Sequence, residues 1–152
     1  MTPSATLATL GIKLPPASAP VGNYVPATRV GNLVYTSGQI PMTDGAVTVT
    51  GKVGDTVTLE QAQAAARTCL LNGLSAIAAV AGGVDAIERI VRVCVYVASA
   101  ASFTDHPQVA NGASDLCVEI FGEAGKHVRS AVGVSVLPLN VPVELELVAQ
   151  VL

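Results

Sequence analysis

The residues best suited to chemistry lie near the C-terminal end of the chain, where Arg129 follows His127 by two positions. Read as a β-strand, this stretch places Arg129 on a face that otherwise carries only small residues: Ala131, Gly133 and Ser135. A guanidinium with free space beside it can hold a carboxylate through two parallel hydrogen bonds. The spacing therefore predicts a binding site for a small anionic molecule.

Two acids follow in the next predicted strand, where Glu144 and Glu146 alternate with apolar residues. Only 12% of the residues are charged, so two acids one step apart need an explanation. One is an acid–base group beside the bound anion; the other is a solvated strand face, an interpretation that suits Glu146 better than Glu144.

Length and composition predict one domain spanning residues 1–152, with residues 1–20 as a Pro-rich N-terminal extension. Hydrophobic residues make up 51% of the chain, and the mean hydropathy is +0.56. No run approaches the roughly 18 apolar residues of a membrane helix, so no membrane partner is expected. The excess apolar surface instead predicts burial against further copies of the chain.

Three cysteines (Cys69, Cys94 and Cys117) fall inside apolar patterns and are interpreted as buried core residues in a reducing compartment. Their spacing fits no zinc pattern, so neither a metal nor another cofactor is expected. The N-terminus lacks the basic start of a secretory signal. These features predict a cytoplasmic protein.

The charge distribution argues against nucleic acid as a partner. The net charge is −3, the eight Lys and Arg residues are scattered, and Trp is absent. Nucleic-acid-binding surfaces usually gather basic residues, often beside aromatic side chains. Gly82 and Gly83 follow a predicted helix instead of opening one, so they indicate a helix end and not a phosphate-binding loop.

Periodicity and turn residues predict the element order β-β-(β)-α-β-α-β-β. A capping box at Thr58–Gln61 opens the first helix, which ends at Gly82. The strand at 90–97 is almost continuously apolar, which indicates cover on both faces. The remaining elements are strands near 24–29 and 33–40, a short surface strand within 44–54, a helix within 102–121, and strands near 128–137 and 141–151.

Several separated motifs then carry a family resemblance: Val21-Gly22-Asn23-Tyr24-Val25, the run from Gly31 to Ile40 with its Ser37-Gly38-Gln39-Ile40, Val128-Arg129-Ser130, Leu137-Pro138 and Glu144-Leu145-Glu146. In this order they resemble the Rid (YjgF) family, which is also labelled endoribonuclease L-PSP. The match covers residue 18 to the end of the chain. Agreement among several motifs is far more specific than any one of them.

The resemblance implies an α+β, chorismate-mutase-like fold with two helices on one face of a mixed sheet. It also implies a homotrimer with a central barrel and three ligand sites in the clefts between subunits. The implied activity is hydrolysis of reactive 2-enamine and 2-imine acids to 2-keto acids and ammonia.

The resemblance also assigns roles to single residues. Arg129 would hold the substrate carboxylate, and Glu144 would position or activate water. Tyr24 would line the pocket, and Ser37 and Gly38 would contact the substrate, Gly38 through its backbone. His127 shares the strand parity of Arg129, so it and Ser130 are further candidates for ligand contact.

Some positions depart from the family pattern. The usual Pro-Ala-Arg-Ser is here His127-Val128-Arg129-Ser130, and Ala131 stands where a cysteine is often found. The segment from Phe103 to Lys126 is longer, so the family's helix asparagine has no fixed counterpart: counting back from Phe121 gives Ser114, and Asn111 lies one turn earlier. The retained arginine favours deaminase chemistry, whereas the changed pocket wall leaves the substrate open.

Structural roles remain as alternatives for each of these residues. Arg129 could be a structural cation paired with an acid at a subunit interface. His127 could be a partly exposed residue at a strand end, and Tyr24 and Ser37 could serve packing. For the whole protein, the alternative to a deaminase is a non-catalytic regulatory protein that binds a 2-keto acid; an endoribonuclease comes third.

Overall fold

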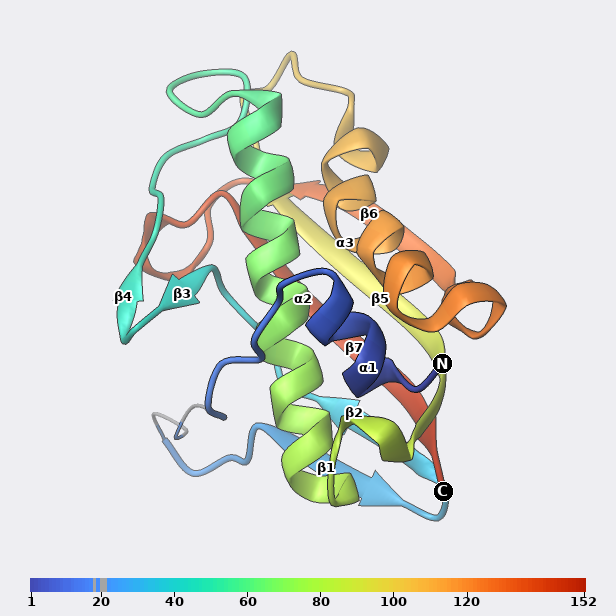
Figure 1. The fold of residues 1–152 in the computed structure, drawn as a ribbon. Helices are drawn as coiled ribbons and strands as arrows, with labels where there is room; N and C mark the ends of the chain where they lie inside the picture. Colours follow the sequence, from blue (N-terminus) through green and yellow to red (C-terminus); the bar gives the residue numbers. More distant parts are fainter. Residues whose placement is uncertain (18, 20–21) are drawn as a thin grey trace.

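Two long helices cover one face of a five-stranded sheet (Figure 1). The computed structural model describes residues 1–17, 19 and 22–152. The helices are α2 (Leu59–Ala81) and α3 (His106–Phe121). In the order in which they pair, the strands are β1 (Ala27–Val30), β2 (Leu33–Thr36), β7 (Val143–Val151), β5 (Ile87–Ala98) and β6 (Val128–Val134). Only the β5–β6 pair is parallel, so the sheet is mixed and the predicted α+β class is confirmed.

Helix α2 begins and ends where the sequence predicts. The Thr58 hydroxyl accepts from the Gln61 amide at 3.1 Å, and the Gln61 side chain accepts from the Thr58 amide at 2.9 Å. Gly82 ends the helix with a φ of 96°, a conformation that glycine adopts without strain. The second predicted helix also ends as expected, since α3 stops before Gly122.

The apolar character of α2 reflects its place in the core. By length and composition this helix could cross a membrane, yet half of its most apolar stretch is buried inside the fold. Its alanines permit close packing, and at Gly112 of α3 a side chain would overlap the Gln63 carbonyl of α2. The two helices therefore approach each other closely above the sheet.

The two faces of the sheet differ in their cover. Val93, Val95 and Leu147 point under the helices and are fully buried or nearly so. The opposite face, called the open face here, has no helix over it (Figure 1). Its apolar side chains include Val30, Tyr35, Val128 and Val132, with exposed fractions of 65%, 42%, 60% and 46%. Within the strand at 90–97 itself, the open face carries exposed Arg92, buried Cys94 and half-buried Tyr96, so the expected cover on both faces is confirmed only in part for the single chain.

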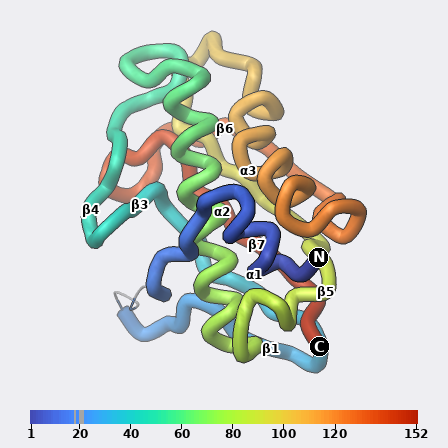
Figure 2. The backbone as a smooth tube through the Cα atoms, viewed as in Figure 1, coloured from blue at the N-terminus to red at the C-terminus, as the bar shows by residue number. Residues whose placement is uncertain are grey.

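The N-terminal segment contains a helix that the sequence patterns did not indicate. Helix α1 (Pro3–Thr9) buries Leu7 and packs against α3 and the short 3₁₀ helix η1 (Val84–Ala86) (Figure 2). Asp85 of η1 accepts hydrogen bonds from the Ser4 amide at 2.7 Å and the Ser4 hydroxyl at 2.6 Å, which lower its pKa. The first part of the predicted extension is thus attached to the domain.

The long segment between β2 and α2 contains a separate two-stranded sheet. A hairpin of β3 (Met42–Thr43) and β4 (Ala46–Val47) replaces the single strand expected within 44–54. Asp44 and Gly45, both at positive φ, turn between these strands, which explains the difference. The 3₁₀ helices η2 (Gly122–Gly125) and η3 (Pro138–Asn140) precede β6 and β7.

The predicted strands near residues 24–40 are shorter than expected. Strand β1 starts only after Pro26, which has no amide hydrogen for a sheet, and β2 ends at Thr36. Gln39 then makes a single antiparallel bridge to Leu145 of β7.

All three cysteines are buried and free, as predicted, but they lie in two different places. Cys69 and Cys117 belong to the core between helices and sheet, whereas Cys94 is paired in register with Glu146 on the open face. Burial raises the pKa of Cys69 strongly and that of Cys117 to about 12, which keeps both thiols protonated.

We expect the melting temperature to be the same with and without a reducing agent, because no cross-link constrains the chain. Thermal unfolding followed by circular dichroism in both buffers measures this. A fall in the melting temperature on reduction would contradict the assignment of these cysteines as free thiols.

Candidate functional site

Arg129 lies on β6, at the edge of the sheet, and points to the face that the helices cover. It is paired in register with buried Val93 of β5, and its side chain reaches α3. Its Nη1 donates to Asn111 Oδ1 at 2.8 Å and to Ser114 Oγ at 3.1 Å. Both candidates for the helix asparagine therefore contact the arginine, because residues three apart share one face of a helix.

His127 belongs to the same cluster, as its strand parity predicts. Its Nε2 lies 2.9 Å from Ser114 Oγ, and its Nδ1 lies 2.7 Å from the Gly125 carbonyl oxygen. The ring is half-buried just before β6 begins. We call Arg129, Asn111, Ser114 and His127 the arginine half-site.

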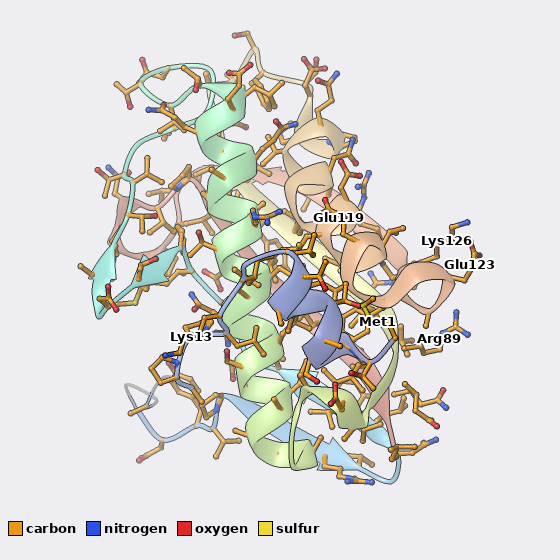
Figure 3. All side chains as sticks on the ribbon, in the orientation of Figure 1. Met1, Lys13, Arg89, Glu119, Glu123 and Lys126 are labelled. Atoms are coloured by element: carbon orange, nitrogen blue, oxygen red, sulfur yellow. The ribbon has the colours of Figure 1, made fainter. Side chains whose placement is uncertain are left out.

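A hollow of about 250 Å³ opens beside the arginine half-site. Lys126 lines it but is paired with Glu123 at 2.7 Å, and both side chains point to solvent at the end of α3 (Figure 3). In the described part of the chain, Nε and Nη2 of Arg129 make no hydrogen bond and no acid pairs with this arginine. Arg129 lines this hollow together with Asp115, so its two unbonded nitrogens are the groups that could bind an anion there.

Glu144 is on the open face of the sheet and not beside Arg129. It is paired in register with Tyr96 of β5, whereas Arg129 shares the helix-covered face with Val93. Its carboxylate lies against Gly38, where any side chain would overlap Glu144 Oε2. Burial, and then the charge of Glu146, raise the pKa of Glu144. A carboxyl with a raised pKa accepts a proton more readily, which suits a general base.

The neighbouring acid has a different environment. The Tyr96 hydroxyl donates to Glu146 Oε1 at 3.0 Å, so this carboxylate is held within the open face. A hydrogen bond with Cys94, then burial and Glu146, raise the pKa of Tyr96. Glu146 is therefore part of a hydrogen-bonded cluster, and the expectation of a simply solvated face does not describe it.

The remaining predicted residues lie on the glutamate's side. Ser37 donates from Oγ to the Val25 carbonyl at 2.6 Å, beside half-exposed Tyr24. Ser37 and Gly38 connect β2 to the bridge at Gln39, and with Glu144 they form what we call the glutamate half-site. Ser130 also lies on the open face, where it accepts from Arg92 Nη2 at 3.1 Å, so it does not join Arg129.

One chain thus holds two half-sites on opposite faces of the sheet. The sequence predicts that Arg129 and Glu144 meet one substrate, and a single chain does not bring them together. Strand β5 separates β6 from β7, and the two side chains point in opposite directions. A site that uses both residues must combine two copies of the chain.

In the described part of the structure, neither a larger hollow on the surface nor a metal-binding cluster provides an alternative site for the predicted residues. A larger hollow of about 500 Å³ lies between residues 13–17, the β3–β4 hairpin and α2, and none of the predicted residues lines it. Within residues 1–17, 19 and 22–152, no group of three or more His, Cys, Asp and Glu side chains is placed to hold a metal ion.

Known proteins resemble the chain over almost its whole length. A family model with the description "YjgF/chorismate mutase-like, putative endoribonuclease" matches residues 4–151, and so includes most of α1. Protein TCP17 of Trypanosoma cruzi is 45% identical over 144 residues, which cover 94% of this chain and 90% of that protein. The 2-iminobutanoate/2-iminopropanoate deaminase of Dermatophagoides farinae is 33% identical, with 89% and 91% covered.

A solved structure agrees with the fold as a whole. The protein Atu1372 of Agrobacterium tumefaciens superposes with a TM-score of 0.89 at 40% identity, covering 99% of this chain and 92% of that one. The mixed sheet, the helix-covered face and the family model together lead to one conclusion. This chain is a member of the YjgF/chorismate mutase-like family, the family also called Rid or L-PSP.

Proposed function

We propose that the protein hydrolyses 2-imino and 2-enamino acids to 2-keto acids and ammonia, in clefts between the copies of a homotrimer. The observation that carries this proposal is the state of Arg129, which lines a hollow and is anchored through Nη1, while its Nε and Nη2 make no hydrogen bond to the described residues. That geometry suits a small carboxylate held by two parallel hydrogen bonds. A relative named as a 2-iminobutanoate/2-iminopropanoate deaminase supports the reaction.

The proposed chemistry needs orientation and proton transfer. Water adds to C2 of the imino acid while Glu144 takes one proton from that water and passes it to the imine nitrogen, which gives a carbinolamine. Glu144 then carries the hydroxyl proton of the carbinolamine to the same nitrogen, the C2–N bond breaks, and ammonia leaves as the C2 oxygen becomes the keto oxygen. A placed acid–base group contributes roughly 10²- to 10⁴-fold to such a step. The chain's own side chains supply every group in this scheme, and no cofactor enters it.

Two features support the proposed trimer: the separation of the two half-sites and the apolar open face. A Glu144 of one copy can meet an Arg129 of the next only if the copies pack around these surfaces. The exposed valines of the open face supply apolar area that association would cover, and three such sheets facing inward would form a central barrel.

We expect a trimer at micromolar concentration without any ligand, measured by sedimentation equilibrium. Val132→Asp puts a charge on the open face and should dissociate the assembly. Val80→Asp is the matched control, because this valine is similarly exposed but lies near the end of α2, away from the open face. A monomeric wild-type protein would contradict both the trimer and the shared cleft.

A further prediction concerns Gly38, which leaves room for the Glu144 carboxylate. Gly38→Ala should displace that carboxylate and lower turnover by up to about a hundredfold, the cost of a small misplacement at a reacting centre. The overlap involves the end of a flexible side chain, so the melting temperature should change little. Unchanged turnover would show that the observed position of Glu144 is not the working one.

The activity itself is tested with an imino acid generated in situ by an amino-acid oxidase. Release of the 2-keto acid should accelerate in proportion to the added protein. The first alternative is a non-catalytic protein that senses a 2-keto acid; it predicts binding without acceleration. An endoribonuclease comes third because the charge pattern does not suit RNA. The proposed location is a reducing compartment such as the cytoplasm, in keeping with the three free thiols.

A further inference from the structure

We propose that His127 is a positioning residue for Arg129 and acts through the hydroxyl of Ser114. The inference deepens the proposed function and rests on it, since the orientation matters only if Arg129 binds a carboxylate. It concerns a position at which this chain departs from the proline of the family pattern.

The hydrogen-bond partners fix where the ring proton lies. His127 Nδ1 is 2.7 Å from the Gly125 carbonyl oxygen, which can only accept, so Nδ1 carries the hydrogen. In the neutral ring Nε2 then has a lone pair, and the Ser114 hydroxyl at 2.9 Å must donate to it. The histidine therefore determines the direction in which the serine hydroxyl points.

That direction suits the arginine. With its hydrogen turned toward His127, Ser114 Oγ presents a lone pair to Arg129 Nη1 at 3.1 Å. Asn111 Oδ1 accepts from the same nitrogen at 2.8 Å. Both hydrogens of Nη1 are then used, which fixes the guanidinium plane and leaves Nε and Nη2 for the ligand. Without His127, the serine hydroxyl is free to rotate and to direct its own hydrogen at the guanidinium.

The far end of this chain of contacts is rigid. Gly125 is buried, and a side chain at that position would overlap the Cys117 carbonyl of α3. The backbone that holds the histidine is thus packed against the same helix that carries Ser114. The arginine is oriented from α3 directly and from η2 through His127.

The first test reads the tautomer and needs no activity. Long-range ¹H–¹⁵N NMR of the histidine rings should show the neutral His127 ring protonated at Nδ1 and bare at Nε2. The opposite tautomer would overturn the proposal, because Ser114 could not then donate to the ring.

The second test measures the Kd for pyruvate by calorimetry, and KM and kcat in the oxidase-coupled assay. His127→Phe keeps a ring without an acceptor and should raise Kd and KM roughly three- to tenfold, with a smaller change in kcat. His127→Gln should restore wild-type values, since its carbonyl oxygen can take the place of Nε2. The double variant His127→Phe/Ser114→Ala should bind pyruvate with the same Kd as Ser114→Ala alone. The two effects should not add, because both changes remove the same contact between Ser114 and Arg129.

The other histidine supplies a matched control. His106 Nε2 makes a similar 3.0 Å contact with the Ser99 hydroxyl, but among the described residues no hydrogen bond links His106 or Ser99 to Arg129. His106→Phe should leave the Kd unchanged. If the wild type binds pyruvate and turns over imine while His127→Phe matches it, the positioning role is wrong and the function stands. If the wild type does neither, the proposed function is wrong, and the role of His127 with it.

Should His127→Phe fail to fold, the comparison of His127→Gln with Ser114→Ala decides the question. A full loss of affinity in the glutamine variant, equal to that of Ser114→Ala, would overturn the proposal.

Discussion

Replacing Glu144 by glutamine is expected to slow imine hydrolysis by roughly 10²- to 10⁴-fold, the contribution of a placed acid–base group. Glutamine keeps the size of the side chain and its hydrogen bonding but cannot accept the proton of the attacking water. The Kd for a 2-keto acid should stay close to the wild-type value, because the carboxylate is held by Arg129. The oxidase-coupled assay and calorimetry measure the two quantities separately.

The pH dependence supplies a second readout of the same residue. Burial and Glu146 raise the pKa of Glu144. On acidification its carboxylate is therefore protonated, and lost as a base, at a higher pH than a glutamate with the ordinary pKa of about 4.3. Turnover by the wild type should therefore fall on acidification through this raised pKa. The glutamine variant should lack that acid limb while it retains residual activity.

Glu146→Gln serves as the control for this prediction. Its carboxylate accepts a hydrogen bond from Tyr96, so the change should affect turnover much less than loss of Glu144. If Glu144→Gln is as active as the wild type, the acid–base role passes to Glu146 or to His127.

The second large effect is expected at Arg129. Arg129→Lys keeps the charge but loses the planar arrangement of donors, and one charge-assisted hydrogen bond is worth about 1.5–3 kcal/mol. Affinity for a small 2-keto acid should fall by roughly ten- to a hundredfold. Arg129→Ala should weaken it further, since charge and donors are both lost. Calorimetric titration with pyruvate measures each step.

The trimer should persist in both variants, because Arg129 points under α3 and leaves the open face intact. Arg89→Ala is the matched control, since this exposed arginine lies on β5 and not on β6 (Figure 3), and its loss should not alter binding. If Arg129→Ala dissociates the trimer while Arg129→Lys binds pyruvate normally, the arginine is an interface residue and the site assignment is wrong.

Local sequence was enough to predict the elements and the side on which single residues lie. The capping box at Thr58 and the glycine at 82 set the limits of α2, because these features act within one turn of the chain. Strand parity correctly grouped His127 with Arg129, since alternation depends only on the local backbone. The hairpin at β3–β4 and helix α1 were not predicted, because two-residue strands and a seven-residue helix carry too little periodic signal.

Only the tertiary structure decided how the two half-sites are arranged. Alternation along one strand tells which of its residues share a face. Which residues of β6 and β7 lie on the same face of the sheet depends on the strand order and register. They place Arg129 under α3 and Glu144 on the open face, so a site with both requires a second copy of the chain. The packing of α3 on β6 likewise decided that Asn111 and Ser114 both hold the arginine, a long-range contact that no local pattern contains.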